Sequence, residues 1–231
     1  MKRFIFDVDG TLSDSRQLMD PEFKAWFLEF MSREKVWLVT GSDYEKTLEQ
    51  LGPEICEHVV TCYNCQGNDI WSRGQRVNSK SFNEPTGLTE LLNGWLQGSK
   101  FPLRTGNHIE KRRGMWNFSI VGRNATIEER KEYVIWDKSN RERESIAYEI
   151  NSMFKDITAT VGGETGLDIG RTGGDKRQIL EDFNADDDIR FFGDKMEQGG
   201  NDYPLANANK YGKNYAVKNW QDTWNKLKEL S

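Results

Sequence analysis

Near its amino terminus the chain reads Phe4-Ile5-Phe6-Asp7-Val8-Asp9-Gly10-Thr11-Leu12, an apolar run that ends in two carboxylates separated by one residue. Successive side chains of a strand point to opposite faces, so Asp7 and Asp9 share a side only if the strand ends and curls into a loop. Gly10 and Thr11 indicate such an end. Because a buried, unpaired carboxylate is costly, two of them at the end of a core strand indicate a divalent cation, and oxygen-only ligands indicate Mg2+.

The same pair of residues suits phosphoryl transfer. One aspartate can attack phosphorus to form an aspartyl-phosphate. A second aspartate two residues later can act as general acid and base for the leaving or entering oxygen. We therefore expect Asp7 to be the nucleophile and Asp9 the acid and base. The apolar strand with its Asp-x-Asp-Gly-Thr ending resembles the first motif of the haloacid dehalogenase superfamily of phosphotransferases. The alternative is a chance acidic turn after the first strand.

Three further features that a phosphoaspartate site needs occur in order along the chain. A second apolar strand runs into Thr40, Gly41 and Ser42, which offer hydroxyl groups to a phosphate. Lys176 stands at the start of an expected helix, where its ammonium can neutralise the phosphoaspartate. Asp194 follows a third strand and glycine and is expected to bind the metal. Each residue alone is a weak signal, but the ordered set is specific.

Composition is that of an ordinary enzyme. The chain has 231 residues, no apolar run of membrane-spanning length and no charged-then-apolar leader, so we expect a cytosolic protein that does not enter a membrane. Its formal net charge of -5 disfavours a nucleic-acid partner, because binding to a phosphate backbone normally shows as a basic balance.

Three cysteines fall within ten residues, and the Cys62-x-x-Cys65 pair allows a zinc or redox interpretation. The chain has only two histidines and no second cysteine pair to complete a zinc site. Reduced structural thiols are therefore the expectation for Cys56, Cys62 and Cys65.

Strand and helix signals alternate at both ends of the chain. The first helix has Asp20 as its N-cap and Pro21 in its first turn. The second runs from Asp43 to Leu51, where Gly52-Pro53 stops it, and strands are expected at 37–40 and 58–62. This alternation predicts an α/β fold, with a doubly wound, Rossmann-like parallel sheet of the haloacid dehalogenase type.

From about Ser81 the alternation stops. Helices are expected at 89–96, 127–134 and 145–154, with strands in 108–121, at 157–161 and at 166–169. This predicts an inserted α+β cap domain over residues 81–174, between core segments 1–80 and 175–231. Between Arg104 and Lys131 the insertion holds seven Lys or Arg against three Glu. Such a cluster is often only a solvated surface, but arginines grip phosphate through two hydrogen bonds, as an anion-binding cap requires.

A closer resemblance extends from Arg3 to about Asn209. The chain is similar to the eukaryotic-type phosphomannomutases in five motifs: residues 37–46, 112–123, 128–130, Gly162-Gly163 with Asp168, and 191–195 with 199–202. The resemblance implies interconversion of mannose 6-phosphate and mannose 1-phosphate, possible action on glucose phosphates, Mg2+, a hexose 1,6-bisphosphate activator, and a homodimer formed through the cap. It also implies that Asp194 binds the metal together with Asp7 and the main-chain carbonyl of Asp9. The residues that would hold the sugar and its distal phosphate are Arg16, Arg112, Arg123, Arg130 and Asp168.

The chain departs from the family at Gly166, where family members carry serine two residues before Asp168. We expect either that a substrate contact is lost and the pocket slightly enlarged, or that the backbone there needs a positive φ. The rigid proline of the family's Ser-Pro-Ile-Gly-Arg motif is also missing from Ser119–Arg123. These departures affect the choice of sugar more than the class of reaction.

Two other functions are alternatives. A sugar-phosphate phosphatase would let water attack the phosphoaspartate. A non-catalytic sugar-phosphate binding protein would need none of Asp7, Asp9, Lys176 and Asp194, all of which are present.

Overall fold

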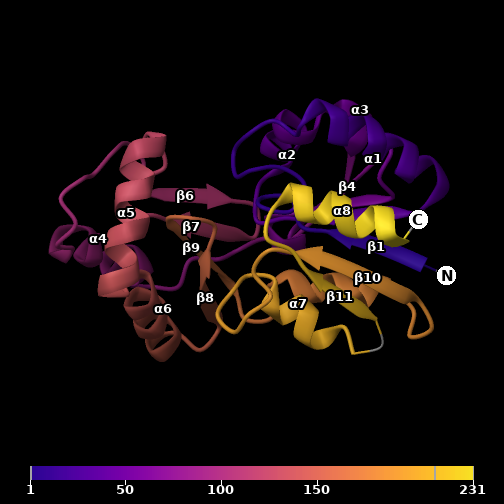
Figure 1. Ribbon diagram of the computed structural model, residues 1–231. Helices are drawn as coiled ribbons and strands as arrows, with labels where there is room; N and C mark the ends of the chain where they lie inside the picture. The colour runs from indigo at the N-terminus through magenta and orange to yellow at the C-terminus, as the bar shows by residue number, and fades with distance from the viewer. Residues whose placement is uncertain (1, 211, 231) are drawn as a thin grey trace. The chain divides into compact units, whose positions relative to one another are not determined.

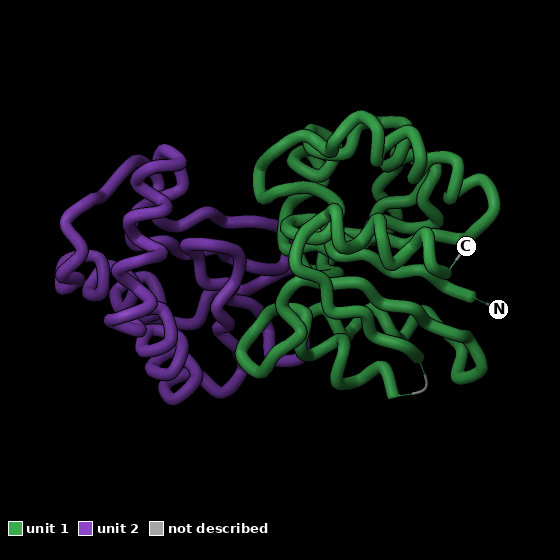
Figure 2. The backbone as a smooth tube through the Cα atoms, in the orientation of Figure 1, with its two compact units in different colours: residues 1–80, 174–231 green, residues 81–173 purple. Residues whose placement is uncertain are grey.

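The computed structural model describes residues 2–210 and 212–230. The chain forms two compact units: a core unit of residues 1–80 and 174–231, and an inserted unit of residues 81–173 (Figure 2). Each unit has its own sheet and its own apolar core.

The core unit is built on a seven-stranded sheet with the strand order β11-β10-β1-β2-β3-β4-β5 (Figure 1). The strands are β1 (Lys2–Phe6), β2 (Val36–Val39), β3 (Thr61–Asn64), β4 (Asp69–Ser72), β5 (Gln75–Ser79), β10 (Asp188–Gly193) and β11 (Lys213–Ala216). The neighbours from β11 to β3 pair in parallel, whereas β4 and β5 add an antiparallel hairpin. The α/β fold expected from the sequence is confirmed, although its sheet is mixed.

Alternating strand residues point to opposite faces of this sheet, and different helices pack on the two faces. Phe4 and Phe6 belong to one buried cluster and Ile5 to another. The first cluster packs against α1 (Pro21–Arg33), α2 (Tyr44–Leu51), α3 (Pro53–Cys56) and α8 (Trp220–Leu230). The second packs against the 3-10 helix η2 (Lys176–Asp182) and α7 (Tyr203–Ala208). Helices on both faces identify the doubly wound arrangement.

The first helix begins as its sequence predicts. Asp20 caps α1 by accepting from the N–H groups of Glu22 and Phe23, each at 3.0 Å, and Pro21 takes the first position. Its buried stripe is Phe23, Phe27 and Phe30. Among residues 2–210 and 212–230, no helix combines the length and apolar character needed to cross a membrane.

The third strand begins later than predicted, at Thr61 instead of His58. The N–H groups of His58 and Val59 donate back to the carbonyl of Ile55 and so continue the turn after α3. Pro53 also starts that short helix, besides following the end of α2. The expectation of reduced thiols is confirmed, because all three cysteines are free and buried; Cys65 opens the 3-10 turn η1 (Cys65–Gly67).

The inserted unit places three helices on one side of a four-stranded antiparallel sheet of order β6-β7-β9-β8 (Figure 1). Its elements are α4 (Leu88–Gly98), β6 (Ile109–Arg112), β7 (Met115–Phe118), α5 (Ile127–Asn140), α6 (Glu142–Met153), β8 (Ile157–Gly162) and β9 (Gly166–Arg171). Helix α5 runs past the predicted end at Val134, because the chain turns only at Arg141, which has a φ of 51°.

The two faces of the inserted sheet differ in chemistry. Trp116 and Phe118 of β7 pack with the helices in the core of the unit. The opposite face carries one row of paired polar residues that crosses all four strands. That row is Glu110, Asn117, Asp168 and Thr160.

Candidate active site

The carboxyl ends of β1 and β10 meet at one edge of the core sheet. The strands are parallel and Phe6 pairs with Phe192, so Asp7 and Asp194 follow neighbouring strands. The side chains of Asp7, Asp194 and Asp202 each bring a carboxylate oxygen within 4.8 Å of the others. Three acidic side chains therefore share the edge at which open α/β sheets bind ligands.

Lys176 is the cation at the centre of this cluster. Its Nζ donates to Oδ1 of Asp7 at 2.5 Å and to Oδ1 of Asp202 at 2.7 Å, and its side chain is fully buried. Burial lowers the pKa of Lys176, but Asp202 and Asp7 outweigh that effect and raise it above its ordinary value. The lysine is therefore charged, and it begins η2 at a turn that Asp175 caps.

Negative charge exceeds positive charge at this edge. Burial raises the pKa of Asp7 despite the attraction of Lys176. Burial also raises the pKa of Asp194 to about 6, although Lys195 acts against it. Asp7 and Asp202 are buried and Asp194 is partly buried. A carboxylate cluster in which burial raises the pKa of two members fits a divalent cation, and its oxygen donors are those that Mg2+ prefers.

The two oxygens of Asp202 are already engaged. Oδ1 accepts from Lys176, and Oδ2 accepts from the N–H of Lys195 at 3.0 Å. Asp202 thus positions Lys176 and the segment after β10, which leaves Asp7 and Asp194 as the carboxylates best placed to hold a metal. Gly10 lets the loop approach: its φ is 83°, and a Cβ there would lie 2.5 Å from Oδ2 of Asp194.

Asp9 does not join the carboxylate cluster. Its side chain accepts from the N–H of Arg16 at 3.2 Å, from Oγ of Ser42 at 3.3 Å and from Nε2 of Gln50 at 3.1 Å. A metal contact through the Asp9 carboxylate is therefore not what the geometry favours, because these donors hold it elsewhere. A metal contact through its main-chain carbonyl stays a prediction.

The hydroxyl residues after β2 support this arrangement. Oγ1 of the buried Thr40 accepts from the N–H of Ser42 at 3.1 Å, which orients the turn that carries the Ser42 hydroxyl to Asp9. Arg16, on the loop between β1 and α1, has a φ of 62°. Its main-chain N–H donates to Oδ1 of Asp9 at 3.2 Å.

A second group of predicted residues lies in the inserted unit. Oε2 of Glu110 accepts from Nη2 of Arg112 at 2.8 Å and from Nε of Arg123 at 2.6 Å. Arg130 donates to Glu164 at 2.9 Å and to Oγ1 of Thr165 at 3.3 Å. All three arginine side chains are thus ordered by carboxylates of their own unit.

Asp168 is held by a residue that the sequence interpretation did not single out. Nδ2 of Asn117 donates to Oδ1 of Asp168 at 2.8 Å. Gly166 precedes this carboxylate on β9, and a Cβ there would lie 2.7 Å from Nδ2 of Asn117. The positive-φ explanation of Gly166 is wrong, because its φ lies outside the left-handed region. The Asn117 amide lies beside Gly166, and the expected enlargement of the pocket stays a prediction.

The predicted residues thus fall into two groups, one in each unit. The core unit carries Asp7, Asp9, Arg16, Thr40, Ser42, Lys176 and Asp194. The inserted unit carries Arg112, Arg123, Arg130, Gly166 and Asp168. Sequence interpretation missed Gln50, Glu110, Asn117 and the role of Asp202. Only Asp202 had a signal, since it ends the Gly199-Gly200-Asn201-Asp202 motif.

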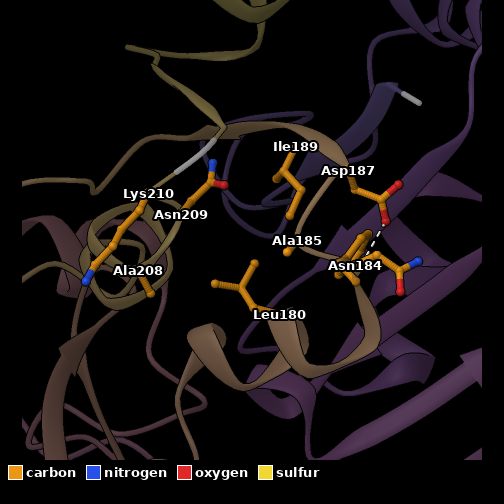
Figure 3. Close-up of a pocket in the computed structure, with 9 residues that line it drawn as sticks. Leu180, Asn184, Ala185, Asp187, Ile189, Ala208, Asn209 and Lys210 are labelled. Atoms are coloured by element: carbon orange, nitrogen blue, oxygen red, sulfur yellow. Dashed lines mark hydrogen bonds between the residues drawn. The ribbon is translucent and has the colours of Figure 1, made fainter.

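Figure 3 shows a separate pocket of the core unit. It is lined by Leu180, Ala185, Asp187, Ile189, Asn209 and Lys210, among others. Ile189 stands at the start of β10, whereas Asp194 follows the end of that strand. The pocket is therefore at the opposite end of β10 from the carboxylate cluster.

Fold and site together define an α/β protein with a doubly wound sheet, an inserted antiparallel unit and a carboxylate cluster at the edge of the core sheet. Similar folds occur in an IMP-nucleotidase of Plasmodium falciparum, with a TM-score of 0.67 and 18% identity over 99% of this chain and 68% of that one. The C-terminal domain of a Candida albicans trehalose-6-phosphate phosphatase has a TM-score of 0.64 and 16% identity over 90% of this chain and 73% of that one.

Sequence similarity is more specific. The sequence model of the eukaryotic phosphomannomutase family matches residues 23–231. Phosphomannomutase 1 of Mus musculus is 34% identical, with 98% of this chain and 90% of that protein covered. The phosphomannomutase of Saccharomyces cerevisiae is 33% identical, with 87% and 83% covered. The chain belongs to the eukaryotic phosphomannomutase family.

Proposed function

We propose that this chain interconverts mannose 6-phosphate and mannose 1-phosphate through an aspartyl-phosphate on Asp7 and a hexose bisphosphate. The observation that carries the proposal is the buried ion pair between Asp7 and Lys176, set in a cluster of three carboxylates at the sheet edge. A lysine at 2.5 Å from one carboxylate oxygen orients the nucleophile and offsets the charge that arrives with a phosphoryl group.

In the first half-reaction an oxygen of Asp7 attacks phosphorus of the hexose bisphosphate. The bond between phosphorus and the sugar oxygen breaks, and Asp9 delivers a proton to that oxygen. In the second half-reaction mannose 1-phosphate presents its free 6-hydroxyl to phospho-Asp7. Asp9 takes the proton of this hydroxyl, and the phosphoryl group passes to the sugar oxygen, which forms the 1,6-bisphosphate. The bisphosphate turns, and the first half-reaction then removes its 1-phosphate and leaves mannose 6-phosphate. The separate hydrogen-bond set of Asp9 suits a group that carries a proton without acting as nucleophile.

The arginines of the inserted unit support a mutase. Such an enzyme must hold the phosphate that does not react, and Arg112, Arg123 and Arg130 provide planar guanidinium groups for it. Asp168, fixed by Asn117, would accept from sugar hydroxyls. These residues would act in both half-reactions, because each phosphate in turn becomes the distal one.

The accessory groups follow from the same proposal. Asp7, Asp194 and the carbonyl of Asp9 would hold Mg2+, which when bound supplies positive charge near the transferring phosphoryl group. A hexose 1,6-bisphosphate would prime Asp7 as activator. A homodimer formed through the inserted unit is also proposed, and light scattering of the full chain tests it directly.

A sugar-phosphate phosphatase is the second candidate. The core-unit site contains everything that water attack on phospho-Asp7 would need, so the core chemistry alone serves either reaction. The distal arginines favour the mutase, since a monophosphate has no second phosphate for them to hold.

Phosphorus NMR separates the two candidates. The full chain is mixed with mannose 1-phosphate, Mg2+ and a catalytic amount of hexose 1,6-bisphosphate. The mutase converts the 1-phosphate signal into the 6-phosphate signal and needs the bisphosphate for its full rate. Accumulation of free phosphate without 6-phosphate would instead establish the phosphatase.

A further inference from the structure

Glu110 holds two of the proposed phosphate-binding arginines with one oxygen. Its Oε2 accepts from Arg112 at 2.8 Å and from Arg123 at 2.6 Å. Arg112 lies on the same strand, two residues away, whereas Arg123 belongs to the segment between β7 and α5. The carboxylate therefore joins two guanidinium groups from different segments of the inserted unit.

Charge explains why a carboxylate is needed between these groups. Burial lowers the pKa of Arg123, as does the positive charge of Arg112, while Glu110 raises it. Burial raises the pKa of Glu110, but the two guanidiniums outweigh burial and lower it to about 2. Glu110 is thus ionised at neutral pH and offsets the repulsion between two like charges.

A carboxylate oxygen and a phosphate oxygen make the same kind of charge-assisted bond to guanidinium. We propose that Glu110 is a resident counter-ion of the Arg112–Arg123 pair that a substrate phosphate must displace or share, so that it limits how tightly the inserted unit holds that phosphate. This inference rests on the proposed function, because it takes the distal phosphate as the ligand of these arginines.

Weaker binding of the distal phosphate favours turnover in this reaction. The bisphosphate has to release its distal phosphate, turn and present the other end to Asp7. A carboxylate that competes for both arginines and repels the phosphate weakens the bound state without removing the guanidiniums. Glu110 is therefore a positioning residue whose loss would tighten binding and slow release.

Glu110→Gln tests this role, because glutamine keeps the shape but removes the charge. Calorimetry measures binding of mannose 1-phosphate to Asp7→Asn protein with and without the second substitution. We expect the dissociation constant to fall by about fivefold or more, since a repelling charge close to the phosphate is gone. The effect should diminish with salt. In the otherwise unchanged enzyme, KM and kcat should fall together.

Glu144→Gln is the matched control. It removes one carboxylate from the same unit, where Glu144 on α6 pairs with the exposed Arg141. Its dissociation constant should equal that of the parent within about twofold. If Glu110→Gln does not fold, Glu110→Asp draws the charge back by one methylene and should tighten binding by a smaller factor.

A raised or unchanged dissociation constant in Glu110→Gln, with a raised KM, would overturn the inference, because a carboxylate that merely orients the arginines gives that result. Tighter binding by Glu110→Gln, in a protein whose parent shows no isomerisation by NMR, would support the counter-ion role of Glu110 and reject the proposed function. Isomerisation by the parent without tighter binding by Glu110→Gln would support the proposed function and reject the counter-ion role.

Discussion

Nζ of Lys176 lies 2.5 Å from Oδ1 of Asp7, although 169 residues separate the two in the chain. Both side chains are buried, and the inserted unit lies between them in sequence. The two core segments must therefore associate to complete this pair. A buried pair is costly to break, because each group alone would be an uncompensated charge.

Asp7→Asn should abolish turnover while the fold persists. The amide keeps the shape of the side chain but has neither the negative charge nor the attacking oxygen. We expect less than about one hundredth of the parent activity, measured by isomerisation of mannose 1-phosphate. Asp14→Asn, an exposed change on the same loop, serves as the control. Higher residual activity would make a covalent route through Asp7 untenable.

Asp9→Asn should lower the activity severely, but less completely than Asp7→Asn. A positioned acid or base typically contributes about 10²- to 10⁴-fold, so kcat should fall within that range. The same variant changes the hydrogen bonds only in part, since an amide oxygen in place of Oδ1 still accepts from Gln50, whereas the NH2 group in place of Oδ2 can only donate to the Ser42 hydroxyl. A loss below about tenfold would mean that another group carries the proton.

The sequence predicts Asp7, Lys176 and Asp194 because each follows a strand end or opens a helix, and parallel strands bring such ends together. It does not predict where the Asp9 carboxylate turns. That orientation depends on Gln50, a polar residue of the amphipathic helix α2. No sequence motif marks Gln50 as a partner of Asp9. Glu110 and Asn117 are missed for a related reason, since pairing across an antiparallel sheet depends on register. The β4–β5 hairpin had a usable signal in Arg73-Gly74.

Arg123→Ala or Arg130→Ala should separate mutase from phosphatase. Each arginine would hold the distal phosphate, which a small aryl phosphate lacks. Isomerisation should therefore fall by at least about tenfold more than any hydrolysis of p-nitrophenyl phosphate. Lys131→Ala, an exposed cation beside Arg130, controls for net charge. Equal losses in both assays would contradict the distal-phosphate role.

Acid should weaken the inserted unit through Glu110. Burial raises the pKa of this carboxyl, but Arg112 and Arg123 bring it down to about 2, below its ordinary value of 4.5. A lowered pKa in the folded state contributes stability above pH 4.5 that is lost as the pH falls towards 2. The main-chain amides of β6 and β7 should therefore be less protected from hydrogen exchange in Glu110→Gln than in the parent at neutral pH. This difference in protection should shrink as the pH falls through this window. A difference that stays constant down to pH 2 would refute the assignment.

Gly166 should broaden the choice of sugar. The resemblance implies a serine at this position in the family, and one hydrogen bond from that serine to the sugar would be worth about 0.5–1.5 kcal/mol. Glucose 1-phosphate should then be isomerised with a kcat/KM within about tenfold of that for mannose 1-phosphate.

Gly166→Ser changes more than this one hydroxyl. The backbone at this position tolerates a side chain, but a Cβ would lie 2.7 Å from Nδ2 of Asn117, so the amide that holds Asp168 must move. The single substitution should therefore raise KM for both sugars, because Asp168 loses its fixed orientation. Gly166→Ser combined with Asn117→Ala removes the clash and isolates the hydroxyl, so the mannose-to-glucose ratio should change in the double variant relative to Asn117→Ala alone. Melting temperatures are measured in parallel. If the ratio is the same in those two proteins and their melting temperatures agree, the serine does not select the sugar and its replacement by glycine does not broaden specificity.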